Sequence, residues 1–295
     1  MIVTRSCFSR LFSRQFSQSA TIDTVPLVFD KHAGPESPNA PIVFLHGLFG
    51  SRLNNRSVSK QLAKRLLRDV YCVDLRNHGD SPHNSRHDYP ALAADVARFF
   101  EDHSLENPIV IGHSMGAKTA MALVLEHPRL CSMMIAVDNA PVDNSGYFGT
   151  GFSKFGKYAR QMRIVEQRCH SSKEADAVLA QVEDSLPVRQ FLMSNLKRKG
   201  DHYTSRVPLE ILAKSLDNVG AFPFDPLYSR WTGPSLFVRG ADSPYISDEM
   251  VVEIGKFFPN FEVRDVQGAG HWLISEKPKE FIDIVVEYIE RIEDE

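Results

Sequence analysis

The stretch PIVIGHSMGAKTAM, residues 108–121, constrains the possible folds of this chain more than any other segment. Its first five residues form a short apolar run typical of a buried strand, and a helical pattern begins at Met115. Between them, Ser114 stands in a G-x-S-x-G pattern, which composition alone would produce in about one chain of this length in ten. Because a strand precedes the pattern and a helix follows it, we predict that Ser114 lies on a sharp, strained turn with its hydroxyl exposed.

Apolar runs alternate with helical patterns along most of the chain. Such alternation predicts an α/β fold, with a mostly parallel sheet and helices on both of its faces. Each apolar run is short and continuous, as expected for strands that are buried on both sides. The expected strands are 41–47, 70–75, 108–112, 131–138, 235–240 and 261–266, and the expected helices are 54–69, 89–105, 115–128, 247–258 and 277–292.

The alternation is interrupted over residues 144–230, which are richer in charged and aromatic residues and mainly helical in pattern. An insertion at this point would lie over the carboxyl edge of the sheet. We therefore predict a helical cap at 144–230 and a core formed by 21–143 and 231–295. Six large side chains of the cap either line an acyl pocket or form the cap's own hydrophobic core: Phe148, Phe152, Phe155, Tyr158, Phe191 and Leu192.

A serine hydroxyl becomes a useful nucleophile only with a base that is oriented by a third group. Among the eleven histidines, His271 is the best candidate, because its GAGHW segment lies in a glycine-bracketed loop between the last strand and the last helix. Two carboxylates, Asp138 and Asp242, each follow a strand and satisfy the chain order Ser…Asp…His. Spacing alone does not choose between them.

The segment HGLFG, residues 46–50, follows the first expected strand, where a second oxyanion donor should lie. We predict that the backbone amides of Leu48 and Met115 bind the oxyanion of a tetrahedral intermediate. His46 is expected to brace its own loop. His78, in DLRNHGDS, is expected to have a structural role.

The first twenty residues differ from the rest of the chain. They contain three arginines and many serines but no acidic residue, and their apolar residues fall near helical spacing opposite the arginines. This composition is typical of a mitochondrial transit peptide, so we expect residues 1–20 to be one and the protein to be mitochondrial. Its removal would leave 31 basic and 37 acidic residues, a net charge of −6.

Charge and cysteine usage exclude several classes of protein. The formal net charge of −3 gives no reason to expect a nucleic acid or an anionic membrane as partner. No apolar run approaches the roughly 18 residues that a membrane span requires, so the protein is not expected to be integral to a membrane. Its four scattered cysteines have no C-x-x-C spacing, so neither a zinc cluster nor a disulfide framework is predicted.

Taken together, these motifs make the chain resemble an α/β-hydrolase. The closer resemblance is to the mitochondrial abhydrolase-domain esterases of eukaryotes, a branch that also contains the yeast ethanol acetyltransferases. It covers about residues 25–292. The segments that carry it are FLHGLFGS, DLRNHGDSPH, IGHSMGAKTAM, AVDNAPV, VRQFLMSNL and GAGHW.

This resemblance implies acyl transfer from a small carboxylic ester or thioester through an acyl-serine intermediate, with no metal, no organic cofactor and no partner protein. It also implies that the triad acid is Asp138, which would leave Asp242 as a bystander or a backup. The expected activity is that of a serine esterase or thioesterase for modest acyl chains. The alternative is an alcohol acyltransferase that makes acetate esters from acetyl-CoA and ethanol with the same triad, and a catalytically idle binding protein is the third hypothesis.

Overall fold

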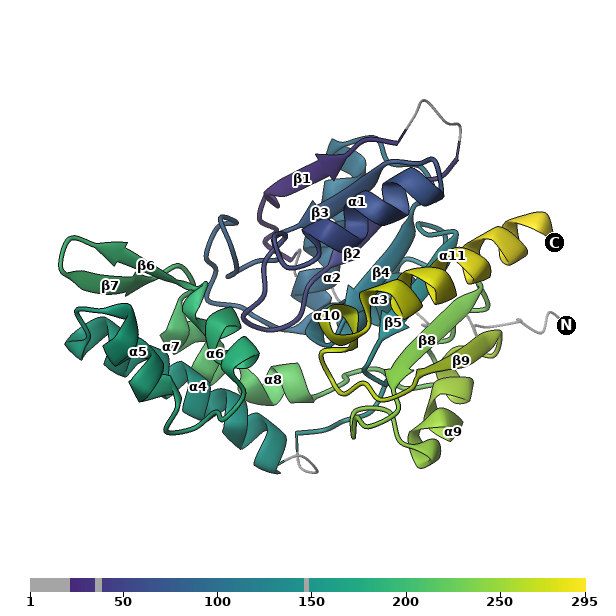
Figure 1. Cartoon of the computed structure of the whole chain (residues 1–295). Coiled ribbons are helices and arrows are strands. Elements are labelled where there is room, and N and C mark those ends of the chain that lie inside the picture. Colours follow the sequence, from purple (N-terminus) through teal and green to yellow (C-terminus); the bar gives the residue numbers. More distant parts are fainter. Residues whose placement is uncertain (1–21, 35–38, 146–148) are drawn as a thin grey trace, which may run out of the picture.

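The computed structural model describes residues 22–34, 39–145 and 149–295, without the side chains of 149–153. The expected transit peptide at 1–20 therefore lies outside the described residues. Figure 1 shows a core built around one sheet and a separate lobe of helices beside it.

A seven-stranded sheet forms the centre of the core, in the order β1-β3-β2-β4-β5-β8-β9. All neighbouring strands are parallel except β1, which pairs antiparallel with β3 at one edge. This arrangement confirms the predicted α/β class. The strands are β1 Phe29–His32, β2 Ile42–Leu45, β3 Val70–Val73, β4 Ile109–His113, β5 Met133–Val137, β8 Ser235–Gly240 and β9 Phe261–Val266.

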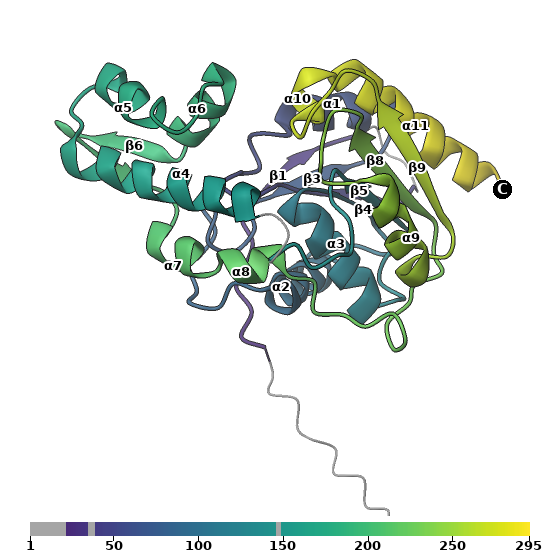
Figure 2. The same cartoon turned by 90° about the horizontal axis from the view of Figure 1, so that it is seen from below.

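Two layers of helices cover the sheet. Successive residues of β2 alternate between them, because neighbouring side chains of a strand point to opposite faces: Ile42 and Phe44 pack in one cluster, Val43 and Leu45 in the other. Figure 2 shows α1, α10 and α11 on one side of the sheet and α2, α3 and α9 on the other. Their bounds are α1 Arg56–Arg65, α2 Tyr89–Asp102, α3 Met115–Glu126, α9 Asp248–Phe257, α10 Leu273–Glu276 and α11 Pro278–Asp294.

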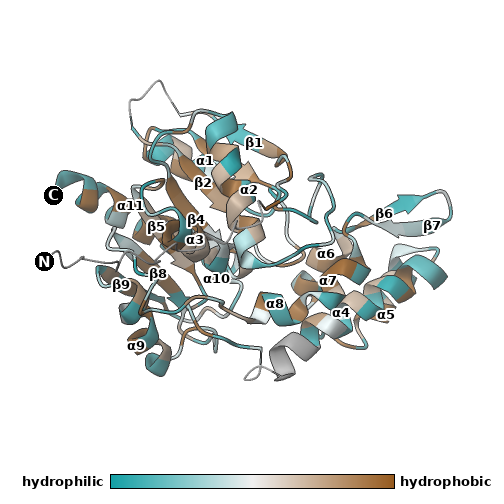
Figure 3. Ribbon diagram, turned by 180° about the vertical axis from the view of Figure 1, so that it is seen from behind, coloured by the Kyte–Doolittle hydropathy of each residue, from teal (hydrophilic) through white to brown (hydrophobic). Residues whose placement is uncertain are grey.

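The lobe beside the core is the segment inserted between β5 and β8. It is mainly helical, as predicted, but it also contains an antiparallel β6–β7 hairpin that the sequence analysis missed. The strong charge of LKRK hid this strand, and β6 is teal in Figure 3 whereas the central strands β2, β4 and β5 are brown. The elements are α4 Gly149–Arg168, α5 Ser172–Leu179, α6 Leu186–Met193, β6 Leu196–Lys199, β7 His202–Ser205, α7 Leu209–Lys214 and α8 Leu216–Gly220.

The chain passes from core to cap near Val142 and returns near Gly220. The fully buried side chain of Lys118, on α3, forms hydrogen bonds to both of these connecting segments. Its Nζ donates to the carbonyl oxygen of Val142 (2.8 Å) at the entry, and to those of Gly220 (2.7 Å) and Ala221 (3.2 Å) at the exit. The Tyr89 hydroxyl adds a 2.6 Å hydrogen bond to a further carbonyl at the exit. The helix that directly follows Ser114 is therefore hydrogen-bonded to both chain segments that connect the cap to the core.

Candidate active site

Ser114 lies on the turn between β4 and α3, with φ 56° and ψ −114°. A positive φ is uncommon for a residue with a side chain, so this turn is strained. Both flanking glycines are sterically required: a Cβ at Gly112 would lie 2.0 Å from the carbonyl oxygen of Gly116, and one at Gly116 would lie 2.4 Å from that of Leu45. The sharp turn predicted from the G-x-S-x-G pattern is therefore present, but Ser114 is buried and lines a cavity, whereas the sequence analysis expected an exposed hydroxyl.

The side chains of Ser114, His271 and Asp138 form a continuous hydrogen-bonded chain. The Nε2 atom of His271 lies 3.0 Å from Ser114 Oγ, and its Nδ1 lies 2.7 Å from Asp138 Oδ2. Because an ionised carboxylate only accepts, Nδ1 carries the proton and Nε2 is free to accept one from the serine. The three residues follow β4, β5 and β9, so the carboxyl edge of the parallel sheet brings them together.

The two candidate acids differ sharply in their surroundings. Asp138 is fully buried, and its carboxylate also accepts hydrogen bonds from the Gly240 backbone N–H (3.2 Å) and the Ser243 hydroxyl. Asp242 is exposed, and among the described residues its carboxylate makes no hydrogen bond to His271. The structure therefore brings Asp138 to the imidazole and leaves Asp242 outside.

Contacts that the sequence analysis missed hold His271 in place. The ring of Tyr245 stacks on its imidazole, with centroids 4.0 Å apart and an angle of 22°. His113 Nε2 donates to the backbone carbonyl of His271 (2.8 Å), and burial lowers the pKa of His113 to about 4, so it is neutral at pH 7. The position of His113 directly before Ser114 was the one sequence feature that could have drawn attention to it. Tyr245 has no such feature, because it reaches His271 through tertiary packing.

The backbone N–H groups of the predicted oxyanion donors, Leu48 and Met115, lie beside Ser114 and have no competing acceptor among the described residues. A turn over Gly47–Gly50, closed by a 2.9 Å backbone hydrogen bond, lies against Ser114, since a Cβ at Gly47 would be 3.2 Å from Ser114 Cβ. Leu48 lines the adjoining cavity, and Met115 is the first residue of α3. Among the described residues, neither backbone N–H has a hydrogen-bond acceptor.

His46 fixes the orientation of the Leu48 N–H, as its expected bracing role requires. Its Nδ1 donates to the carbonyl oxygen of Gly47 (2.8 Å), and its Nε2 accepts from the Leu75 N–H (3.0 Å). Because the peptide group is planar and trans, the Leu48 N–H points away from the carbonyl that His46 and Gly50 bind. Burial lowers the pKa of His46 to about 4, so this neutral tautomer persists at pH 7.

His78 supports the same turn, consistent with the structural role expected for it. Its Nε2 accepts from the Phe49 N–H (3.1 Å), and its Nδ1 donates to the carbonyl of Arg76 (2.9 Å). Burial lowers the pKa of His78 to about 3, which keeps Nε2 available as an acceptor. The loop after β3 thus supports the turn over Gly47–Gly50, which contains the predicted oxyanion donor Leu48.

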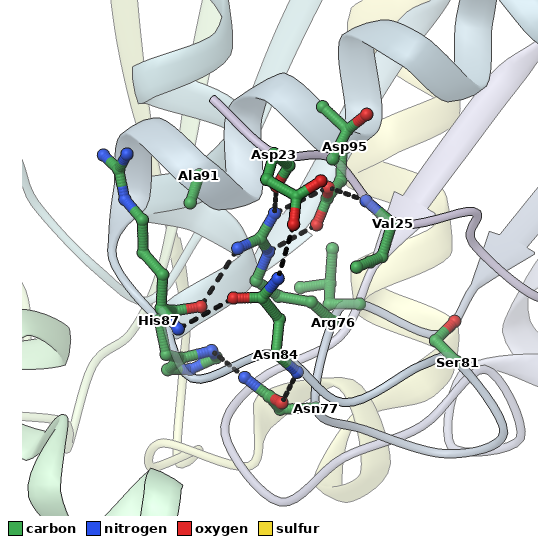
Figure 4. Close-up of polar contacts among 12 residues, drawn as sticks. Asp23, Val25, Arg76, Asn77, Ser81, Asn84, His87, Ala91 and Asp95 are labelled. Atoms are coloured by element: carbon green, nitrogen blue, oxygen red, sulfur yellow. Dashed lines mark hydrogen bonds and ion pairs between the residues drawn. The ribbon is translucent and has the colours of Figure 1, made fainter. Parts of the chain in front are cut away.

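A buried ion pair anchors the loop that carries His78 (Figure 4). The guanidinium of Arg76 makes two hydrogen bonds, of 2.6 and 2.8 Å, to the carboxylate of Asp95 on α2, and both side chains are fully buried. Arg76 also donates to the carbonyls of Arg86 and Asp23, and Asp95 accepts from the Val25 N–H. These contacts satisfy both buried charges, which makes the loop rigid.

A cavity of about 500 Å³ opens from Ser114 between the core and the cap. Of the six cap residues proposed to line an acyl pocket, Phe155 and Phe191 do so. Tyr158 and Leu192 are instead buried in the hydrophobic core. Phe148 and the side chain of Phe152 lie outside the described part of the structure. Core residues on the opposite wall include Val58, Trp272 and Ile274.

The described residues contain neither a candidate metal site nor a helix suited to span a membrane. Within them, no cluster of three or more histidine, cysteine, aspartate or glutamate residues could hold a metal ion. Nor does any helix in the same residues have the length and hydropathy needed to cross a membrane.

A known family matches most of the chain. The family described as "alpha/beta hydrolase fold" matches residues 40–278, and the chain therefore belongs to the α/β-hydrolase family. A solved structure titled "Marine microorganism esterase" superposes with a TM-score of 0.82 at 31% identity, covering 90% of this chain and 100% of the other.

Two relatives have names that describe an activity. A Saccharomyces cerevisiae protein named "Probable alcohol acetyltransferase" is 44% identical over 276 residues, covering 87% of this chain and 79% of the relative. A Mus musculus protein named "sn-1-specific diacylglycerol lipase ABHD11" is 36% identical over 274 residues, covering 92% and 88%. These similarities confirm the predicted branch of abhydrolase-domain proteins and yeast acetyltransferases.

Proposed function

We propose that this protein is a serine esterase or thioesterase that cleaves small carboxylic esters or thioesters of modest acyl chains. The observation that carries the proposal is the hydrogen-bonded chain from Ser114 through His271 to Asp138, beside two unpaired backbone N–H groups. The cavity of about 500 Å³, lined by aromatic and aliphatic side chains together with polar ones, has the size of a small-molecule site.

In the acylation step, the Ser114 hydroxyl attacks the acyl carbon while its proton passes to His271 Nε2. The carboxylate of Asp138 stabilises the imidazolium, and the N–H groups of Leu48 and Met115 bind the oxyanion. The imidazolium then gives its proton to the leaving alcohol or thiol as the bond to the acyl carbon breaks. In a second step, water gives a proton to His271 Nε2 as it attacks the acyl-serine, and the imidazolium then returns the proton to Ser114 Oγ as the bond between Oγ and the acyl carbon breaks and the acid leaves.

The acceptor in this second step distinguishes two functions. Similarity to the relative named as an alcohol acetyltransferase supports an alcohol as the acceptor, and similarity to the relative named as a lipase supports water. Incubating the purified protein with acetyl-CoA and ethanol separates the two. Ethyl acetate as a product supports the transferase, whereas free acetate alone supports the hydrolase.

The test of the chemistry combines short p-nitrophenyl esters with a fluorophosphonate probe. Wild type should turn the esters over, and the probe should label Ser114. The Ser114→Ala variant should lose labelling and retain only the slow catalysis that binding and the oxyanion donors supply. No turnover and no labelling of wild type would refute the proposal.

We also propose that residues 1–20 direct the protein to mitochondria. The support is the composition of this segment, with three arginines and no acidic residue. A fluorescent reporter fused to residues 1–30 should enter mitochondria, and changing Arg5, Arg10 and Arg14 to Gln should prevent entry. A reporter that remains outside with the arginines intact would contradict the proposal.

A further inference from the structure

Phe49, next to the predicted oxyanion donor Leu48, adopts a left-handed backbone conformation with φ 60°. It occupies the third position of the turn that the Gly50 N–H closes onto the Gly47 carbonyl. A bulky residue rarely adopts a positive φ, and such a conformation persists only where surrounding contacts hold it. The contacts of Phe49 therefore act together with those of His46 to hold Leu48 in place.

Those contacts come from opposite parts of the molecule. On the core side, the Phe49 N–H donates to His78 Nε2 (3.1 Å). On the cap side, Asn195 Nδ2 donates to the Phe49 carbonyl oxygen (2.8 Å), and the Phe155 ring lies 6.2 Å from the Phe49 ring, centroid to centroid. Phe49 is thus held in its strained conformation by contacts with both the core and the cap.

Asn195 is itself firmly held in the cap. It lies between α6 and β6, with 4% of its surface exposed. Its N–H donates to the carbonyl of Leu192 at the end of α6 (3.1 Å), and its carbonyl accepts from the Arg206 N–H (2.7 Å). The same helix α6 lines the cavity through Val188 and Phe191. Asn195 therefore connects α6, which lines the cavity, to the turn over Gly47–Gly50 that contains Leu48 and Phe49.

We propose that Asn195 is a positioning residue for the oxyanion hole, through which the cap holds Leu48 in its donating orientation. The inference rests on the proposed acyl-transfer function. It also gives a role to the asparagine of VRQFLMSNL, a segment that contributes no residue to the Ser114–His271–Asp138 triad. A cap displaced from the core would release the Phe49 carbonyl and lower transition-state binding without moving Ser114 or His271.

Removing the amide tests this role through its effect on kcat. Asn195→Ala should lower kcat by roughly tenfold or more while KM stays within about twofold, because the oxyanion forms only in the transition state. Affinity for a trifluoromethyl ketone, whose adduct places an oxyanion in the hole, should fall by a similar factor. Thermal unfolding of each variant shows whether the fold is intact.

Asn195→Asp adds a test based on pH within a single folded protein. The side chain has nearly the same shape, but an ionised carboxylate cannot donate to the Phe49 carbonyl, whereas a protonated carboxyl can. The activity of Asn195→Asp relative to wild type should therefore be lowest at pH 8 and rise as the pH is lowered to 5.5. A ratio that is constant with pH would overturn the proposal, even if Asn195→Ala does not fold.

Asn218 provides the matched control, since it is also a cap asparagine whose Nδ2 donates to a core carbonyl, that of His87 at 3.2 Å. Its Ala and Asp variants should keep wild-type kcat and show no relative pH effect. Equal losses in the Asn218 and Asn195 variants, or a loss in KM alone, would indicate a purely structural role and overturn the inference. If wild type itself has neither turnover nor labelling, the proposed function fails instead.

Discussion

His271 Nδ1 lies 2.7 Å from the buried carboxylate of Asp138, whereas Asp242, the other candidate acid, is exposed. The imidazole therefore has one carboxylate partner among the described residues. That contact fixes the tautomer in which Nε2 faces Ser114.

The first prediction follows from this contact. Asp138→Asn should lower kcat by roughly 10³- to 10⁴-fold, because an amide can donate to Nδ1 and so favours the wrong tautomer. Asp242→Asn should stay within about twofold of wild type. Ester hydrolysis by the two purified variants makes the comparison, and the reverse ranking would show that Asp138 is not the acid.

The second prediction concerns the packing beneath the nucleophile. In Gly116→Ala, the added Cβ would lie 2.4 Å from the Leu45 carbonyl oxygen, and backbone cannot move aside cheaply. We expect a loss of about 1–3 kcal/mol of stability, together with most of the activity. Gly156→Ala, whose Cβ would meet only Leu216 Cδ1 at 3.5 Å in the middle of α4, should instead stabilise by about 0.5–1 kcal/mol. Urea unfolding measures both, and a neutral Gly116→Ala would refute the steric argument.

The third prediction concerns the buried ion pair that anchors the His78 loop. Arg76→Met leaves Asp95 as an uncompensated buried charge, so it should cost about 3–5 kcal/mol in the free energy of unfolding. Arg98→Met breaks the exposed pair with Asp102 on the same α2 and should cost no more than about 0.5 kcal/mol. Similar midpoints of denaturation for the two variants would contradict the importance of the buried pair.

The fourth prediction is acid sensitivity caused by buried histidines. Burial lowers the pKa of His46 to about 4 and the pKa of both His78 and His87 to about 3, against about 6.5 in the unfolded chain. Below pH 6.5 the unfolded state binds more protons than the folded state, so stability falls as the pH is lowered. Each histidine should cost about 2 kcal/mol at pH 5 relative to pH 8.

Thermal unfolding between pH 8 and pH 5 checks this expectation. His87→Asn removes one of the buried groups and should give a shallower fall in the unfolding midpoint. His83→Asn changes an exposed histidine and is the matched control. If His87→Asn falls as steeply as wild type, the buried imidazole is not a source of the acid sensitivity.

Local patterns were enough to predict the class of fold and the residues that meet at Ser114. The strands that form the centre of the sheet are continuous apolar runs, and the turn at Ser114 needs glycines for steric reasons that appear directly in the sequence. The edge strand β1, FDKH, escaped prediction because its burial is only partial and its pairing with β3 depends on tertiary contact. The β6–β7 hairpin could have been detected from the Gly200-Asp201 pair at its turn.

The residues that support the site were harder to predict. Tyr245 and Ser243 reach His271 and Asp138 from a loop more than a hundred residues from Asp138. Asn195 contacts Phe49 across 146 positions of the chain. Such side chains have no local periodicity that marks them, because their partners are set by how the cap packs on the core. Asp138 and Asp242 had equivalent positions in the sequence; the family resemblance favoured Asp138, and the three-dimensional arrangement brings that residue to His271.

The three carbonyls bound by Lys118 have a consequence for how substrates reach the nucleophile. An outward movement of the whole cap would break the hydrogen bonds between the buried Lys118 amine and these carbonyls. Leaving a buried amine without hydrogen-bond partners is energetically costly. Small shifts of α6, whose residues border the cavity, disturb none of these bonds. Substrate entry and product exit should therefore involve local movement of α6 rather than movement of the whole cap.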